Sequence, residues 1–187
     1  CETLHTTNFD PGGFAEYLRV PALNLRRGTY KLPDQMTYDE GVFIEPVACV
    51  VRGQRVIGMK PGLTLLILGS GFSGLLHLAQ ARNIGLTRII TTDVNDYRLS
   101  LAKKLGATAA LKADEDVPAR VRELNEGRLA DLAVICTGAV SAFDQAMASV
   151  DRGGSVLCFA TPEPGINVTI PINAFWRNSV TIKSSYA

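Results

Sequence analysis

Short apolar runs alternate with amphipathic stretches along the chain from Gly62 onward. The runs are rich in β-branched residues, which is typical of strands, and they lie at Leu65–Gly69, Arg88–Asp93, Ala109–Lys112, Leu132–Cys136, Ser155–Ala160 and Ser179–Ser185. The stretches between them have helical spacing, at Ser73–Ile84, Asp96–Leu105, Val117–Asn125 and Ser141–Val150. Because strands alternate with helices over short connections, residues 62–187 predict an α/β domain with a doubly wound, six-stranded parallel sheet.

Residues 1–61 follow a different pattern. Phe14–Val20 alternates like a strand, and Thr37–Gly53 has helical spacing. Thr37 and Glu40 fit a capping box, which would start this helix. We therefore expect residues 1–61 to be the end of a mostly β module with a connecting helix, and the chain to be part of a longer protein.

The segment LLILGSGFSG at Leu65–Gly74 joins a strand directly to a GxGxxG turn and a helix. Gly69 permits the tight turn, Gly71 lets backbone amides approach a pyrophosphate, and Gly74 lets the helix pack closely on the strand. The helix N-terminus then presents N–H groups to the phosphates. Strand, turn and helix agree, so they predict a Rossmann dinucleotide-binding domain rather than an unrelated glycine-rich loop. The cofactor-binding residues expected here are Gly69, Gly71, Phe72, Ser73 and Gly74.

The second predicted strand ends in Asp93, about 20 residues after Gly71, where a ribose-binding acid is expected. Its carboxylate can accept hydrogen bonds from the ribose hydroxyls and would repel a 2′-phosphate, so we predict NAD rather than NADP as the cofactor. Arg98 opposes this preference slightly, because an arginine can pair with a phosphate. The alternative role for Asp93 is to cap the following helix.

The carboxyl ends of the last three strands are further candidates, because ligands of open α/β sheets bind outside these ends. We expect them to line the ribose and nicotinamide region, with simple connecting loops as the alternative. The residues concerned are Cys136, Thr137, Gly138, Ala160 and Thr161, together with Ser184–Tyr186.

Composition narrows the function classes. Nineteen basic residues against 18 acidic ones give a net charge of +1. The chain therefore has no excess of positive charge that would attract nucleic acid or an anionic membrane. No apolar run reaches the roughly 20 residues of a membrane span, and no signal-peptide pattern is found, so we expect a cytoplasmic protein. The cysteines lack CxxC spacing, which favours reduced thiols.

Several segments, in this order and spacing, resemble the zinc-containing medium-chain alcohol dehydrogenases, and most of all the sorbitol and threonine dehydrogenase-like branches. The segments are Gly12–Tyr17, Lys31–Pro33, Glu45–Pro46, Leu65–Gly74, Cys136–Gly138 and Phe175–Asn178. The resemblance covers essentially the whole chain. It implies NAD-dependent, zinc-assisted oxidation of a secondary alcohol, such as a polyol or a threonine-like hydroxy acid, by hydride transfer to the nicotinamide.

The resemblance implies metal roles for two residues. Glu45 stands where other alcohol dehydrogenases carry a cysteine, which implies a catalytic zinc ligand or a carboxylate beside the ion. Cys1 resembles the last of four cysteines that hold a structural zinc, although the other three are absent. We expect zinc only in the full-length parent and no activity from this chain alone. From the residues alone, we expect Glu45 to be a partnered or exposed charge.

Three other reactive side chains have no predicted role. His77 has apolar neighbours at helical spacing and is expected to be structural. Cys49 follows Glu45 by one helical turn and is expected to be a core residue, although it could face the same pocket. Cys158 lies in a predicted buried strand and is expected to be inert.

Two other functions stay open. A zinc-free NADPH quinone or enoyl reductase of the same superfamily is one, against which Glu45 and Asp93 argue. A non-catalytic, nucleotide-binding Rossmann domain is the other. The last predicted strand, Ser179–Ser185, is expected to be a sheet edge that pairs with a second copy in a homodimer or homotetramer.

Overall fold

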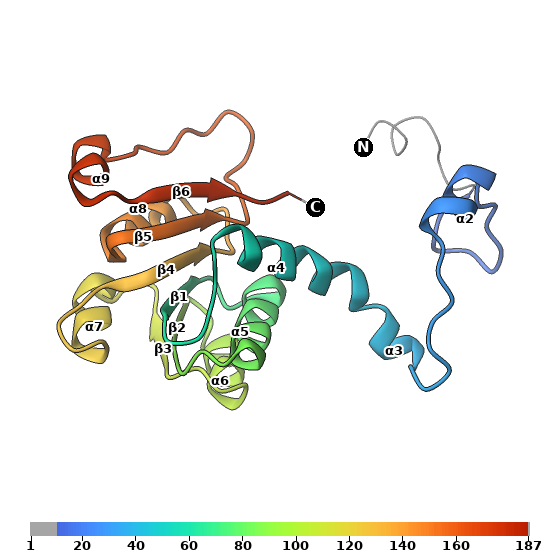
Figure 1. Ribbon diagram of the computed structural model, residues 1–187, viewed down its shortest axis with the longest axis horizontal. Helices are drawn as coiled ribbons and strands as arrows, with labels where there is room; N and C mark the ends of the chain where they lie inside the picture. Colours follow the sequence, from blue (N-terminus) through green and yellow to red (C-terminus); the bar gives the residue numbers. More distant parts are fainter. Residues whose placement is uncertain (1–10, 187) are drawn as a thin grey trace. The chain divides into compact units, whose positions relative to one another are not determined.

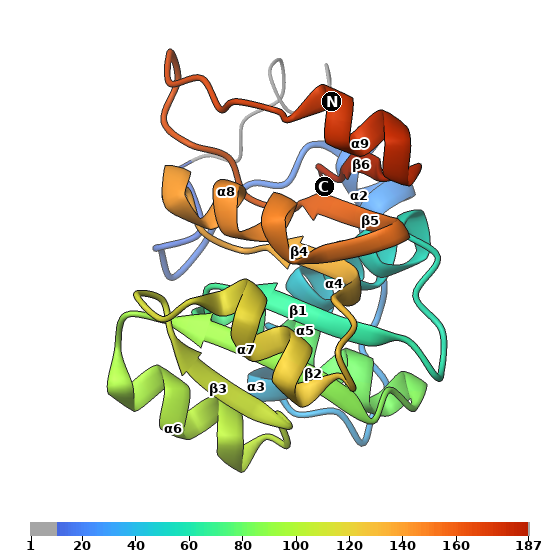
Figure 2. The same ribbon diagram turned by 90° about the vertical axis from the view of Figure 1, so that its left-hand side faces the viewer.

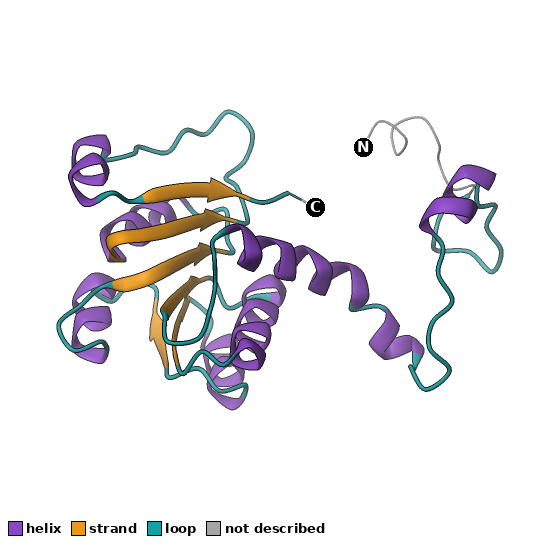
Figure 3. Cartoon of the chain, viewed as in Figure 1, coloured by secondary structure: helices purple, strands orange, loops and turns teal. Residues whose placement is uncertain are grey.

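The computed structural model describes residues 11–186 of the chain. The chain divides into two compact units, which meet in the sequence between Gly41 and Val42. In the described part of the first unit, the regular elements are two helices, α2 (Ala22–Gly28) and α3 (Tyr38–Gly41), as Figure 3 shows. The capping box before α3 is confirmed. The Thr37 N–H donates to Glu40 Oε2 at 2.8 Å, and the Glu40 N–H donates to Thr37 Oγ1 at 3.2 Å.

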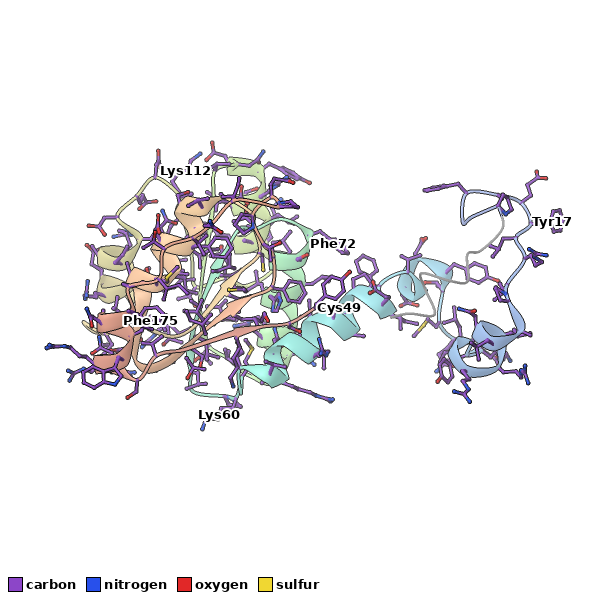
Figure 4. The ribbon with its side chains drawn as sticks, turned by 90° about the horizontal axis from the view of Figure 1, so that it is seen from above. Tyr17, Cys49, Lys60, Phe72, Lys112 and Phe175 are labelled. Carbon is purple, nitrogen blue, oxygen red and sulfur yellow. The ribbon has the colours of Figure 1, made fainter. Side chains whose placement is uncertain are left out.

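The prediction of a strand at Phe14–Val20 is wrong. The backbone there is irregular, with one bridge position at Arg19. The side chains of Phe14 and Tyr17 are exposed, so no apolar face is buried there. Figure 4 labels Tyr17. A strand is stable only when partners pair with it and cover one face, and alternation along the sequence does not supply these partners.

The helix predicted at Thr37–Gly53 is interrupted at Val42 and Phe43, and it resumes as α4 (Ile44–Val56). The cause is Pro46, in the first turn of α4. Proline lacks the N–H that would continue the helix, and its ring clashes with the carbonyl four residues earlier, that of Val42. The domain boundary that we expect near residue 61 stays a prediction; α4 belongs to the second compact unit and contacts α5.

The second unit contains one parallel sheet, and the predicted Rossmann fold is confirmed (Figure 1). Its strands are β1 (Thr64–Leu68), β2 (Arg88–Asp93), β3 (Ala109–Lys112), β4 (Ala130–Ile135), β5 (Val150–Cys158) and β6 (Thr181–Ser184). They are ordered β3-β2-β1-β4-β5-β6. The order reverses between β1 and β4, so ligands are expected in the crevice outside the carboxyl ends of these two strands.

Helices cover both faces of the sheet. One face carries α4, α5 (Phe72–Ile84) and α6 (Asp96–Lys104); the other carries α7 (Val117–Leu124), α8 (Val140–Ser149) and α9 (Ile172–Asn178), which lie toward the viewer in Figure 2. Successive strand residues point to opposite faces, so Leu65 and Ile67 enter one core and Leu66 and Leu68 the other. Helix α9 has no counterpart among the predicted elements. No helix in the described part of the chain is long and apolar enough to cross a bilayer.

A buried polar contact joins α4 to α5. The side-chain amide of Gln54 donates to the carbonyl oxygen of His77 at 2.9 Å, and it lies 3.3 Å from His77 Nδ1. The imidazole also packs edge to face on Phe159, with ring centroids 4.5 Å apart. His77 is fully buried and is a core residue, as predicted. Burial lowers the pKa of His77 to about 4, so the ring is neutral in the folded protein at neutral pH.

This burial predicts a pH-dependent loss of stability. Histidine in the unfolded chain titrates near pH 6.5, so the unfolded chain takes up a proton before the folded one does. The contribution of neutral His77 is complete above pH 6.5 and falls by about 3 kcal/mol between pH 6.5 and pH 4. Urea unfolding over this range should show the loss in the wild type. The variant His77→Asn keeps an acceptor for Gln54 and should lack it; an equal loss in both proteins would contradict the assignment.

Candidate functional site

Two glycines at the junction of β1 and α5 cannot be replaced by another residue without strain. Gly69 has a φ of +95°, which favours glycine, and a Cβ there would lie 3.2 Å from the Cys136 backbone. At Gly74, a Cβ would lie 1.9 Å from the carbonyl oxygen of Gly69. The first turn of α5 therefore packs directly on the end of β1, as the GxGxxG pattern predicts.

Gly71 differs from these two glycines because the space beside it is open. A Cβ at Gly71 would meet nothing within 4 Å. Gly71 is also the N-cap residue of α5, and no side chain caps this helix. The N-terminal N–H groups of a helix have no intrahelical partner and carry a partial positive charge, so this open space suits a phosphate group.

Asp93, at the end of β2, is held against the same turn. Only 5% of its side chain is exposed. Its Oδ2 accepts from the Ser70 N–H at 2.8 Å, and its Oδ1 accepts from the Asn95 N–H at 2.8 Å. Each carboxylate oxygen has two lone pairs, so both keep capacity for ligand hydroxyl groups. The cap of α6 is Asn95, whose Oδ1 accepts from the Arg98 N–H at 3.2 Å, so the alternative role of Asp93 as the cap is wrong.

Arg98 lies beside this carboxylate. Its Nη1 is 3.7 Å from Asp93 Oδ2, and about half of its side chain is exposed. Lys112, at the end of β3, is directed elsewhere: its Nζ is 2.7 Å from Asp96 Oδ1 and donates to the Val94 carbonyl at 3.2 Å. Arg98 is therefore the cation closest to Asp93 among the ion pairs of the described residues.

One continuous cleft runs along the carboxyl ends of β1 to β4, and we name it the Gly71 cleft. It is lined by Gly69, Gly71, Thr92, Asp93, Val94, Arg98, Ala113, Cys136, Thr137, Ala139, Ser141, Ala142 and Gln145. The α8 residues of this lining were not predicted from the sequence, because helix residues that reach a cleft from the opposite face have no local signature. Gln145 is one of them; its side chain donates to the Ala113 carbonyl at 2.6 Å.

Some of the predicted residues after β4 and β5 line the cleft, and the others do not. Cys136 and Thr137 line the Gly71 cleft. Gly138 touches the next loop, because a Cβ there would lie 2.8 Å from the Thr161 carbonyl oxygen. Ala160 donates its N–H to Ile135 O at 2.9 Å, and neither Ala160 nor Thr161 lines the cleft. Burial raises the pKa of the Cys136 thiol far above its usual range, so this thiol stays protonated.

A second pocket, which we name the Glu45 pocket, lies between α4, the start of α5 and the segment after β6. It is lined by Glu45, Pro46, Cys49, Val50, Phe72, Ser73, Leu76, Phe159, Ser185 and Tyr186. Cys49 lies in this pocket and not in the core (Figure 4). Its thiol donates to Glu45 Oε1 at 3.1 Å, and this hydrogen bond is the main cause that raises the pKa of Cys49. Phe72 and Ser73 of this pocket directly follow Gly71, which lines the Gly71 cleft.

The family model of the zinc-binding dehydrogenases matches residues 74–187. The chain belongs to this family. It is 34% identical to L-threonine 3-dehydrogenase of Chromobacterium violaceum over 176 residues. The match covers 94% of this chain and 50% of that protein. The chain thus spans about half the length of the curated relatives that it matches.

Solved structures of related dehydrogenases have the same fold. A protein from Sinorhizobium meliloti 1021, assigned to the zinc-binding dehydrogenases and bound to NADP, matches with a TM-score of 0.84 and 30% identity, over 94% of this chain and 51% of that one. The 2R,3R-butanediol dehydrogenase of Bacillus subtilis matches with a TM-score of 0.76 and 27% identity, over 84% of this chain and 45% of that one.

Membership of the zinc-binding dehydrogenases raises the question whether the described residues can hold the metal. Zinc sites use three or four protein ligands. Among residues 11–186, no three His, Cys, Asp or Glu side chains come together in this way. Glu45 and Cys49 are two neighbouring donors, which do not complete a site, and Cys1 lies outside the described residues. The metal roles of Glu45 and Cys1 stay predictions.

Gly74 and Gly71 predict very different losses of stability when each is changed to alanine. Gly74→Ala places a methyl group against the Gly69 carbonyl and should lower the free energy of unfolding by about 3 kcal/mol or more. Gly71→Ala meets open space at an ordinary φ of −74° and should cost less than about 1 kcal/mol. Urea unfolding of both variants tests this, and equal destabilisation would contradict the geometry of the turn.

Proposed function

We propose that this chain is the cofactor-binding half of an NAD-dependent, zinc-assisted dehydrogenase that oxidises a secondary alcohol to a ketone. The observation that carries the proposal is the open space at Gly71 beside the buried carboxylate of Asp93. The relatives support the choice of an alcohol, since they include threonine and butanediol dehydrogenases. A polyol or a threonine-like hydroxy acid is the proposed substrate class.

In this proposal, each part of the dinucleotide meets a different part of the site. The N–H groups at the start of α5, beside Gly71, bind the pyrophosphate. The oxygens of Asp93 accept the hydroxyl groups of the adenosine ribose, and Cys136 and Thr137 border the path toward the nicotinamide. The nicotinamide end would lie near the Glu45 pocket, whose residues Phe72 and Ser73 directly follow Gly71 of the cleft. NAD held by these residues would supply the acceptor for the hydride of the alcohol carbon.

Zinc is part of the proposal for the whole protein only. Glu45 would be one of its ligands, and the other ligands would come from residues outside the described part of the chain. The role of the described residues is to bind and orient the cofactor beside that carboxylate.

The environment of Asp93 supports NAD over NADP. A 2′-phosphate would lie next to a buried carboxylate whose charge repels it. Two observations favour the opposite choice: Arg98 lies 3.7 Å from Asp93 Oδ2, and the Sinorhizobium meliloti relative is bound to NADP. Arg98 already faces the Asp93 carboxylate, so we propose that the carboxylate decides the preference.

Calorimetric titration with NADH and with NADPH tests this choice. We expect NADH to bind at least about tenfold more tightly. Asp93→Asn removes the repelling charge and should reduce this ratio by about tenfold. The matched control is Asp96→Asn, which removes an exposed carboxylate paired with Lys112 and should leave the ratio unchanged. Tighter binding of NADPH by the wild type would favour the zinc-free reductase instead, and binding of neither would exclude a dinucleotide site.

We also propose that the chain pairs with a second copy through β6, which is the last strand of the sheet order. Apolar side chains are exposed beside this edge, namely Ile170, Ile172, Trp176 and Ile182. An uncovered strand edge with apolar surroundings is a template for pairing, and a two-fold partner would cover both features.

Light scattering after size exclusion tests the pairing. We expect a dimer or tetramer at micromolar concentration for the wild type. Ile182→Lys places a charge on the edge strand and should yield a monomer, whereas Val94→Lys, at an exposed apolar residue of the Gly71 cleft, should not. A wild-type protein that is monomeric throughout would contradict the proposal.

A further inference from the structure

Arg52 connects the helix that carries Glu45 to the chain segment that follows β6. Glu45, Cys49 and Arg52 are spaced by four and three residues on α4, so they lie along one face of this helix. The Nη1 group of Arg52 donates to the carbonyl oxygen of Tyr186 and, at 3.3 Å, to Ser185 Oγ. Ser185 and Tyr186 both line the Glu45 pocket. Arg52 therefore holds one wall of this pocket against another.

The segment after β6 has few other attachments. The Ser185 N–H donates to the Cys158 carbonyl at 3.3 Å, which continues the sheet by one bond. The side chain of Tyr186 is 89% exposed, so no burial anchors it. Lys183 donates to the Val56 carbonyl at 2.7 Å, but this contact ties β6 to the opposite end of α4, away from Glu45. Among the described residues, Arg52 is the side chain that fixes the segment at the pocket.

Arg52 is not engaged as an ordinary surface ion pair. In residues 11–186, no carboxylate lies within ion-pair distance of its guanidinium group. Its hydrogen-bond partners are a backbone carbonyl and a hydroxyl group more than 130 positions away in the sequence. A planar guanidinium with several N–H donors can order two acceptors of one loop at once.

We infer that Arg52 is a positioning residue, which fixes the peptide groups of Ser185 and Tyr186 for the nicotinamide end of the cofactor. The inference rests on the proposed function. A carboxamide needs an N–H donor and a carbonyl acceptor at fixed positions. The Ser185 N–H is bonded to Cys158 and the Tyr186 carbonyl to Arg52, so in this inference the peptide group that joins Ser185 to Tyr186 supplies both. If the segment were loose, its ordering would reduce the affinity for the nicotinamide end alone.

The test compares NADH with ADP-ribose, which has the adenosine, pyrophosphate and second ribose but no nicotinamide. Arg52→Met keeps the aliphatic stem and removes the donors. We expect the Kd for NADH to rise about tenfold and the Kd for ADP-ribose to change less than about twofold. Bound NADH should also show lower fluorescence anisotropy, because its ring is held less firmly. Arg52→Lys restores one donor and should recover part of the affinity.

The matched control is Arg55→Met, which removes an exposed arginine from the same helix and should change neither Kd. An unchanged ADP-ribose affinity shows that each variant is folded. Equal weakening of both ligands by Arg52→Met would overturn the inference, since it would indicate a general structural role. No weakening of NADH would also overturn it. Failure of wild-type protein to bind either ligand would instead reject the proposed function, and the inference with it.

Discussion

The close contact between Gly74 and the carbonyl group of Gly69 determines how the first strand of the sheet meets its first helix. A Cβ at Gly74 would lie 1.9 Å from that carbonyl oxygen, so the helix can approach this closely only with glycine. The approach places the N-terminus of α5 beside the end of β1 and leaves Gly71 open. The Asp93 carboxylate then holds the same turn to β2 through the Ser70 N–H. We propose that the pyrophosphate and the adenosine ribose of the cofactor bind where these contacts meet.

The parts of the structure that the sequence predicted well are those with local causes. Strand β1 and the turn after it follow from an apolar run and three glycines, and the structure needs two of these glycines for steric reasons. Asp93 could be singled out because the end of a parallel strand has a fixed place in the sheet. His77 could be assigned to the core from its apolar neighbours alone, and it is fully buried.

Most of the parts that it missed depend on contacts between distant residues. The alternation at Phe14–Val20 suggested a strand, but the described residues supply no sheet for it to join. The break before α4 is the exception, because it has a local cause, the missing N–H and the ring of Pro46. The pairing of Arg52 with Ser185 spans 133 positions, and no local pattern indicates it. The place of Cys49 in the Glu45 pocket depends in the same way on how α4 meets α5 and β6.

The central claim is that a dinucleotide lies across the turn after β1 with its ribose on Asp93. Backbone amide NMR spectra of this chain, recorded as NADH is added, test it most directly. We expect the amide signals of Ser70, Gly71 and Ser73 to shift with a single saturating dependence on NADH. The amide of Asn125, whose side chain bonds to the amino end of β1, should stay unchanged. Amide signals that shift elsewhere while those of the turn stay unchanged would contradict this placement of the cofactor.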